Sequence, residues 1–599
     1  MILQTIDTLI IGVFFVIVLG IGWMASRTAG KSTDEFFLGG RSMPWWLLGV
    51  SMVACTFSAD TPNLVTGMVR EDGVSKNWAW WAFLITGMVT VFIYAKLWRR
   101  SNINTDLEFY ELRYSGKAAS FLRGFRCLYL GILFNCLIMG TVTLAAIKIG
   151  AVMFGLPPIT VVIGASIGVV IYASLGGIKG VIWADFFQYG VAMLGAVYAA
   201  IVAVRQPEVG GLGNLLTHPA VADKLSFFPV MDNWSALVTL LIIPIAVQWW
   251  AVWYPGAEPG GGGYIAQRML SAKDEKNAIG ATLFFNFAHY ALRPWPWIIV
   301  ALASMIIFPD LDAIKAEFPQ ITAQYLGDDV AYPAMLTRLG PGWLGLVVAS
   351  IIAAYMSTIG THLNWGSSYV VNDFYKRFVK PDASQKELVR IGRISTVTLM
   401  VISAIFALTI LENATQAFDM LLISGAGTGA IYLMRWFWWR INAWTEIVAM
   451  IVATLNAVVL VLIVPDEAVA TAVLDGFTMK LLLAVGITSV VWLIATFVTP
   501  AESIETLKKF YKQTRPGGPG WKHVIAALEA DGESKYAGQR WDVPHGLLSV
   551  FIGCISIYSA LFGIGNLVYG QLLHGIILLV VFGLGLYLLF KLRTRLNIE

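Results

Sequence analysis

The sequence predicts an all-α integral membrane protein with about fifteen transmembrane helices. Of its 599 residues, 57% are hydrophobic and only 13% are charged, and the mean hydropathy is +0.71. A soluble domain of ordinary composition carries roughly 25% charged residues. Apolar runs long enough to span a bilayer recur from one end of the chain to the other. These runs must be helical, because a lipid-embedded segment has to satisfy its own backbone hydrogen bonds.

The individual spans are predicted from apolar windows, with boundaries uncertain by a few residues. They cover residues 5–26, 44–69, 77–98, 122–152, 157–175, 180–203, 235–254, 277–308, 341–375, 388–411, 414–436, 440–463, 478–498, 544–566 and 569–592. The first window lacks a preceding Lys or Arg and a small-residue cleavage site, so we expect a retained helix and not a signal peptide. The four cysteines are scattered and predict neither a disulfide nor a structural metal.

Basic residues occur in every second loop, which predicts the orientation in the membrane. They begin at Arg27, Lys96, Lys179, Arg268, Lys376, Arg435 and Lys508, and at Lys591 in the tail. Because short loops rich in Lys and Arg stay in the cytoplasm, we expect an inner-membrane protein with its N-terminus outside and its C-terminus inside. A net charge of +4, spread along the chain, argues against nucleic-acid binding.

Two spans contain helix breakers or small polar residues at membrane depth. Span 44–69 includes the run from Thr56 to Pro62, and span 235–254 leads into Pro259-Gly-Gly-Gly-Gly263. Such backbone is tolerated where it lines a cavity, and paired interrupted helices mark the binding site of inverted-repeat transporters. Because the two spans are five apart, we expect a five-plus-five inverted repeat. The alternative is that Pro62 only kinks a helix and that the glycines lie outside the bilayer.

These features divide the chain into seven segments. They are 1–43, an extra helix and cytoplasmic linker; 44–203, the first repeat; 204–234, an external loop; 235–436, the second repeat; 437–498, additional helices; 499–543, a cytoplasmic loop; and 544–599, a helix pair and tail. The cytoplasmic loop, of about 45 residues, is too short for a convincing catalytic or sensory domain. Its amphipathic part is a candidate for a helix along the membrane surface.

Polar side chains inside the spans point to a cation site. Ala354, Ser357, Thr358 and Thr361 share one helix face, and hydroxyls together with freed carbonyls are the hard oxygen ligands of an alkali cation. The alternative for the hydroxyls is bonding within their own helix or helix packing. Asp185, near the start of span 180–203, is a functional candidate with a cation as partner, unless the span begins later and Asp185 is an interfacial charge.

Several motifs resemble the sodium/solute symporter family, which includes galactose, proline, sialic-acid and glucose carriers. They are Phe36-Phe-Leu-Gly-Gly-Arg41, Met43-Pro-Trp-Trp46, Trp183-Ala-Asp-Phe-Phe-Gln188, Tyr264-Ile-Ala-Gln-Arg268, Ala354-Tyr-Met-Ser-Thr358 and Asn372-Asp-Phe-Tyr-Lys376. They occur in the family's order on the predicted helices. The resemblance implies the leucine-transporter-type fold, with one extra helix before the ten-helix repeat and about four after it.

The resemblance also implies which residues bind sodium. The shared sodium site falls on the carbonyls of Ala54, Phe57 and Ala354 and on the hydroxyls of Ser357 and Thr358. A second site, found in some members, falls on Asp185, Ser357, Gly360 and Thr361. Because Gly360 has no side-chain oxygen, this second site is in doubt.

The solute is expected near mid-membrane, between the interrupted helices. The candidate pocket residues are Asp60, Thr61, Trp80, Trp249, Trp253, Glu258, His289 and Arg293. Sugar-carrying relatives have a lysine at the position of His289. Arg293 follows His289 by one helical turn and needs an anionic partner, which is either the solute or an internal carboxylate such as Asp60 or Glu258. A sugar or other neutral polyhydroxy solute is our first expectation, and a carboxylate or amino acid is the alternative.

The predicted function is sodium-coupled symport of a small polar organic solute by alternating access. We expect sodium, the solute and the lipid bilayer as partners, and no obligatory protein partner. A membrane sensor built on the same core is the alternative from another class. The sequence does not indicate an enzyme, because it shows no HExxH motif, P-loop or paired nucleophile and base.

Overall fold

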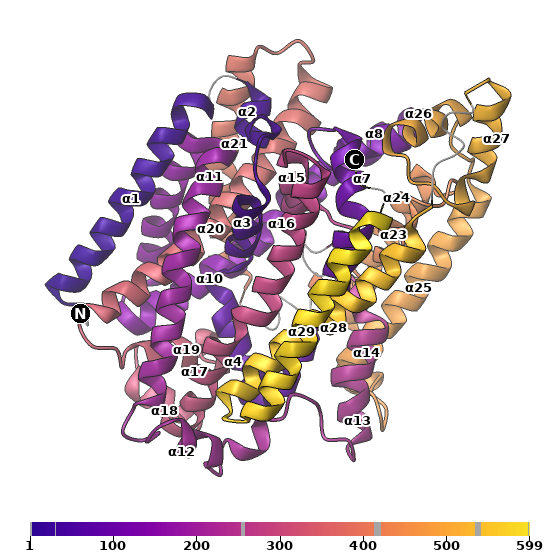
Figure 1. Cartoon of the computed structure of the whole chain (residues 1–599). Coiled ribbons are helices and arrows are strands. Elements are labelled where there is room, and N and C mark those ends of the chain that lie inside the picture. The colour runs from indigo at the N-terminus through magenta and orange to yellow at the C-terminus, as the bar shows by residue number, and fades with distance from the viewer. Residues whose placement is uncertain are drawn as a thin grey trace.

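The computed structural model describes residues 3–29, 32–252, 258–411, 421–533, 541–596 and 598, and Figure 1 shows the resulting bundle. Eleven helices within these residues are long and apolar enough to cross a membrane. Three further apolar helices are shorter: Trp45–Thr56, Pro158–Ile171 and Trp234–Trp250. The all-α class is therefore confirmed for the part of the chain that the structure describes.

The first half of the chain contains helices α1 to α12, and some predicted spans are divided among several of them. They are α1 (Thr5–Ala29), α2 (Thr33–Leu38), α3 (Trp45–Thr56), α4 (Asp60–Asp72), α5 (Trp78–Trp81), α6 (Leu84–Val89), α7 (Ala95–Ser101), α8 (Glu108–Arg113), α9 (Gly116–Leu128), α10 (Asn135–Phe154), α11 (Pro158–Val204) and α12 (Leu212–Thr217). Within α11, Gly177 has φ 53° and ψ −163°, so this one element contains the two predicted spans 157–175 and 180–203.

The second half continues the bundle and adds helices beyond it. They are α13 (Trp234–Leu237), α14 (Ile243–Ala246), α15 (Gly263–Ser271), α16 (Glu275–Phe287), α17 (Pro294–Ile307), α18 (Leu311–Glu317), α19 (Ala331–Leu336), α20 (Trp343–Ser368), α21 (Gln385–Thr409), α23 (Gly429–Met434), α24 (Ala443–Ala457), α25 (Gly476–Val498), α26 (Ile504–Thr514), α27 (Lys522–Ala530), α28 (Val543–Val568) and α29 (Leu572–Leu592). A π-helical turn, η9 (Ala288–Leu292), joins α16 to α17.

The predicted interruption of span 44–69 is confirmed. The helix α3 ends at Thr56, and α4 begins at Asp60 after a non-helical Phe57 with φ −88° and ψ 78°. Pro62 lies in the first turn of α4, where its missing N–H removes no helical hydrogen bond. The break therefore leaves carbonyl groups at the end of α3 and amide groups at the start of α4 available for other partners.

A second interruption was missed by the sequence analysis. Span 414–436 was expected to be one helix, but the described part turns at residues 425–428 before α23. Gly425 and Gly429 lie against the backbone that follows α14: a Cβ atom at these positions would lie 1.5 Å from the Val252 carbonyl oxygen and 1.6 Å from the Trp250 carbonyl oxygen. Glycine is needed here because two interrupted segments meet backbone to backbone.

The segments expected outside and those expected in the cytoplasm lie toward opposite ends of the bundle. Figure 1 places the N-terminus with α12 and α18, from loops expected outside, at one end of the molecule. The C-terminus lies toward the other end, with α8, α26 and α27 from segments expected in the cytoplasm. We call this second end the predicted inner face.

The described part of segment 499–543 packs against the predicted inner face. The side chain of Gln513 on α26 donates a hydrogen bond to the carbonyl of Ser101 at the end of α7. The Trp521 indole donates to the carbonyl of Trp436 (2.9 Å), and the Phe510 ring lies 5.7 Å from the rings of both Phe109 and Trp436. The described part of this segment is therefore fixed to the helix ends.

Candidate ion and solute site

The residues expected to bind sodium come from two helices that touch. The Thr358 hydroxyl of α20 donates a hydrogen bond to the carbonyl of Cys55 in the last turn of α3 (3.0 Å), and the Ser357 hydroxyl donates to Asp185 (2.5 Å). A hydroxyl that gives its proton to another acceptor keeps its lone pairs for a cation. Ala54, Phe57 and Ala354 are buried at the same junction. The local geometry is therefore compatible with a small cation bound by oxygen atoms.

Asp185 is fully buried inside the bundle and is not an exposed interfacial charge. Its carboxylate accepts hydrogen bonds from Ser51 (2.6 Å) and Ser357, and it lies 3.6 Å from the Arg268 guanidinium. Arg268 also donates to the Thr361 hydroxyl (2.8 Å). The side chains expected at a second sodium site are thus held by an arginine from one of the family-like motifs.

The central cavity lies at the break between α3 and α4 and has about 940 Å³ of space not occupied by atoms, including its opening to solvent. Six of the eight predicted pocket residues line it: Asp60, Thr61, Trp80, Glu258, His289 and Arg293. Trp249 is not among the lining residues; its backbone carbonyl accepts a hydrogen bond from Thr86. Trp253 lies outside the described residues.

Arg293 binds a backbone carbonyl and a histidine. Its guanidinium donates to the Thr56 carbonyl at the end of α3 and to Nε2 of His289 (3.1 Å). Because Nε2 is an acceptor in this arrangement, His289 carries its proton on Nδ1 and donates to the Thr56 hydroxyl (3.1 Å). A cation at the C-terminus of a helix is favourable. Arg293 therefore caps the broken helix.

Glu258 pairs with Arg126 and not with Arg293, contrary to one of our expectations. The Arg126 guanidinium lies 2.9 Å from Glu258 and donates to the Tyr432 hydroxyl (2.5 Å). Asp60 does not form an ion pair with Arg293 within 4 Å among the described side chains. The sequence could not reveal the Arg126 contact, because 132 residues separate the two partners.

The sequence analysis did not predict several of the residues that line the cavity. Asn286 on α16 is fully buried, and its Oδ1 atom has no hydrogen-bond partner among the described residues. Its amide packs on Gly87 of α6, where a Cβ atom would lie 1.7 Å from Oδ1. Tyr290 stacks on Trp80, with ring centroids 5.8 Å apart. A polar residue one turn before His289 was the only available signal for Asn286.

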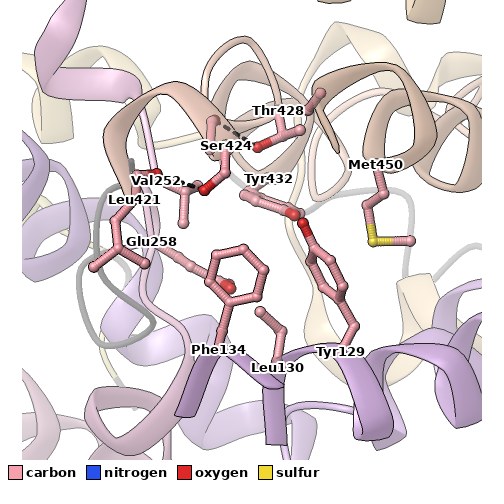
Figure 2. Close-up of a pocket in the computed structure, with 12 residues that line it drawn as sticks. Tyr129, Leu130, Phe134, Val252, Glu258, Leu421, Ser424, Thr428, Tyr432 and Met450 are labelled. Carbon is pink, nitrogen blue, oxygen red and sulfur yellow. Dashed lines mark hydrogen bonds between the residues drawn. The ribbon is translucent and has the colours of Figure 1, made fainter. Parts of the chain in front are cut away.

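A second, smaller cavity adjoins the central one. Figure 2 shows Tyr129, Phe134, Tyr432 and Met450 around it, with Glu258 at its edge. Because Glu258 lines both cavities, the Glu258–Arg126 pair forms part of the boundary between them. This boundary lies next to the two interrupted segments that meet at Gly425.

The family model described as sodium:solute symporter family matches residues 36–453. The chain is 27% identical to the sodium/glucose cotransporter of Vibrio parahaemolyticus over 453 residues, which cover 73% of this chain and 81% of that relative. It is 24% identical to the sodium/sialic acid symporter SiaT of Proteus mirabilis over 442 residues, covering 71% and 83% of the two chains. The human sodium/myo-inositol cotransporter is 26% identical over 491 residues, covering 74% of this chain and 64% of that relative.

A solved structure has the same fold. It is a Na⁺-coupled sialic acid symporter in a substrate-bound outward-open state, with a TM-score of 0.67 and 21% identity, and the match covers 84% of this chain and 99% of that one. The motifs that resemble the family, the break between α3 and α4 and the family match all point to the same family. Because the family model matches more than half of the chain, this protein belongs to the sodium:solute symporter family.

Proposed function

We propose that this sodium-coupled symporter imports a small polar organic solute, with a sugar or polyol favoured over a carboxylate. Sodium would bind where α3 breaks against α20, with oxygen ligands from Ala54, Phe57, Ala354, Ser357 and Thr358. The observation that carries this proposal is the contact between the end of α3 and the hydroxyl face of α20, in which Thr358 donates to Cys55. Removing the ion would weaken the link between the two helices.

The solute would bind in the central cavity. A carboxylate solute is less favoured, because Arg293 already donates to the Thr56 carbonyl and to His289. The cavity also provides stacked aromatic rings from Trp80 and Tyr290, and such faces suit the flat side of a sugar. Asp60 and Thr61 would contact the solute from the start of α4.

We propose one bound sodium ion and the predicted arrangement of the chain in the membrane. The residues of the second candidate sodium site, Asp185 and Thr361, contact Arg268, and Gly360 adds no side-chain oxygen, so we do not propose a second ion.

We also propose that residues 44–203 and 235–436 form the inverted repeats and that the N-terminus faces outward. The charge pattern of the loops and the two ends of the bundle in Figure 1 support this orientation.

We infer alternating access from the different affinities with which the ion would bind two conformations of the protein. An ion that holds α3 against α20 stabilises one conformation relative to the other, and it can shift the equilibrium only by the difference in its affinity for the two. Solute bound between the broken helix and η9 would then permit closure on the outer side. A sensor would bind the same ligands without moving them across the membrane.

Uptake of radiolabelled solutes into proteoliposomes, with and without a sodium gradient, tests the proposal. In the Ser357→Ala/Thr358→Ala variant, the sodium concentration for half-maximal uptake should rise about tenfold or more, equivalent to about 1.4 kcal/mol. The matched control is Ser367→Ala/Ser368→Ala, which removes two neighbouring buried hydroxyls that bond within α20. Equal sodium dependence in the two folded variants would contradict the proposed site.

A further inference from the structure

Three charged side chains line the central cavity, and two of them have partners. Glu258 pairs with Arg126 at 2.9 Å. Arg293 donates to the Thr56 carbonyl, at the negative end of the α3 dipole, and lies 5.4 Å from the centre of the Trp297 ring. Asp60 is the third charged group.

Asp60 has an oxygen that is ready to accept a hydrogen bond. It lies in the first turn of α4, where the helix dipole favours a negative charge. Its Oδ1 atom is buried and, among the described residues, has no hydrogen-bond partner and takes part in no ion pair. A carboxylate removed from water is strongly destabilised unless a cation or a donor reaches it.

The aromatic wall of the cavity also suits a positive charge. Trp80 and Tyr290 stack with an interplanar angle of 23°, and both line the cavity. The Trp80 indole N–H already donates to Asn77 (2.8 Å) and one ring face stacks on Tyr290, so this ring can offer the solute its opposite face. The negative face of an aromatic ring attracts an ammonium group.

Other polar groups of the cavity are suited to accept hydrogen bonds from hydroxyl groups of a solute. The Oδ1 atom of Asn286 is buried without a partner among the described residues, and the Ser58 hydroxyl lies beside the Asp60 side chain; both residues line the cavity. His289 adds no second positive charge, because both of its ring nitrogens are used in the neutral form. The free hydrogen-bonding capacity is therefore dominated by acceptors.

We propose that the solute is a polyhydroxylated compound that carries one protonated amine, and that this amine binds Asp60. This inference rests on the proposed function, because it takes the central cavity as the solute site. The hydroxyl groups would meet Ser58 and Asn286, and the ammonium group would lie near the Trp80 ring. Asp60 then selects the amine against a neutral hydroxyl at the same position.

The first test needs no solute. Asp60→Asn keeps the shape of the side chain and removes its charge, so the melting temperature of the full chain in sodium buffer should rise. Glu71→Gln, an exposed carboxylate on the same helix, is the matched control and should leave it unchanged. A lower melting temperature for Asp60→Asn would overturn the proposal, because it would mean that the carboxylate already has a partner in the free protein.

The second test compares matched solutes on the full chain in sodium and in potassium buffer. The probes are D-glucosamine, D-glucose and D-glucuronate, together with N-methylglucamine, sorbitol and gluconate as the acyclic set. We expect sodium-dependent thermal stabilisation by the amines, at least tenfold weaker apparent binding of the neutral members, and loss of this preference in Asp60→Asn. Binding of the neutral or acidic members only, or of none of the amines, would overturn the proposal.

Failure of this inference can be told apart from failure of the proposed function. Sodium-driven uptake of a neutral sugar, unaffected by Asp60→Asn, would refute the amine and leave the symporter intact. If Asp60 instead held the coupling ion, Asp60→Asn would raise the sodium requirement for every solute alike, which also refutes the inference. Absence of sodium-dependent uptake for all solutes, with no stabilisation by sodium alone, would refute the proposed function itself.

Discussion

Two parts of the molecule differ in how their carboxylates are paired: the ion pairs Arg126–Glu258 and Arg435–Glu446, which we call the ion network, and Asp60 at the helix break in the central cavity. In the network, Glu258 lies 2.9 Å from Arg126, and Glu446 lies 3.4 Å from Arg435. In the cavity, Asp60 has a buried oxygen without a partner in the part of the chain that the structure describes. Glu258 and Glu446 are buried, and the Oδ1 atom of Asp60 is buried as well, so burial of these atoms does not explain the difference. It indicates that the network holds the helices together, whereas the cavity keeps groups available for a ligand.

The network also involves the segment that lies beyond the family match. The Arg113 guanidinium donates to the carbonyls of Arg435 (2.8 Å) and Trp438 (3.0 Å) and lies 5.2 Å from the centre of the Trp521 ring. Trp521 precedes α27, and the family model ends at residue 453. The paired charges and the additional helices therefore form one continuous structure on the predicted inner face.

Arg126→Ala should give the largest effect, because it leaves Glu258 buried without its cation. Breaking a buried pair in this way costs about 3–5 kcal/mol. The measurement is the melting temperature of the purified protein in detergent. The double variant Arg126→Met/Glu258→Gln removes both charges and should recover most of the loss; if it is no better than Arg126→Ala, shape and not charge pairing explains the contact.

Arg293→Gln tests whether this arginine belongs to the structure or to the solute site. Loss of the charged donor leaves the Thr56 carbonyl without its cap, at a cost of about 1–3 kcal/mol. We expect lower thermal stability and an equal loss of uptake for every solute. A selective loss of acidic solutes with unchanged stability would instead assign Arg293 to the solute.

Gly87→Ala tests how closely the cavity wall is packed. The new Cβ would lie 1.7 Å from Asn286 Oδ1, and overpacking of this kind costs about 1–3 kcal/mol. Rotating the Asn286 amide away would break its hydrogen bond to the Thr282 carbonyl (2.8 Å). The loss in melting temperature should be relieved in Gly87→Ala/Asn286→Ala, and a double variant as unstable as the single one would argue against this contact.

Gln513→Ala should give the smallest effect. It removes one hydrogen bond between α26 and the Ser101 carbonyl, worth about 0.5–1.5 kcal/mol. Faster amide hydrogen exchange confined to α26 is the expected result. Gln320→Ala, which removes an exposed hydrogen bond to the Ala151 carbonyl, serves as the control. No change in α26 exchange would show that this bond does not fix the segment.

The sequence predicted the features that depend on composition and local chemistry. Apolar length identified the spans, and the polar run before Pro62 identified the break between α3 and α4. The interruption at residues 425–428 was missed because its signal is a run of small residues, Ser424-Gly-Ala-Gly-Thr-Gly429, and such residues in membrane helices are also common at packed interfaces. Only the structure shows that Gly425 faces the Val252 carbonyl.

The partners of charged residues were harder to predict. Asp60 and Glu258 were reasonable partners for Arg293, but the structure gives it the Thr56 carbonyl. A sequence does not show which backbone groups a helix break releases, or which distant helix supplies Arg126. Trp249 was expected in the cavity from its place near a break, yet the residues that line the cavity do not include it.

The contact at Cys55 gives this protein a built-in chemical reporter. The Cys55 thiol is fully buried, and its backbone carbonyl accepts the Thr358 hydroxyl. Cys127 and Cys136 are buried as well, and only Cys554 is partly exposed. After Cys554→Ser, a water-soluble thiol reagent can label Cys55 only in a conformation that exposes its buried thiol, and separation of α3 from α20 is the motion that we expect to expose it. The rate of Cys55 labelling, measured at increasing sodium concentrations, would report how sodium changes the opening of the ion site. This measurement needs no added fluorophore and no engineered residue at the site.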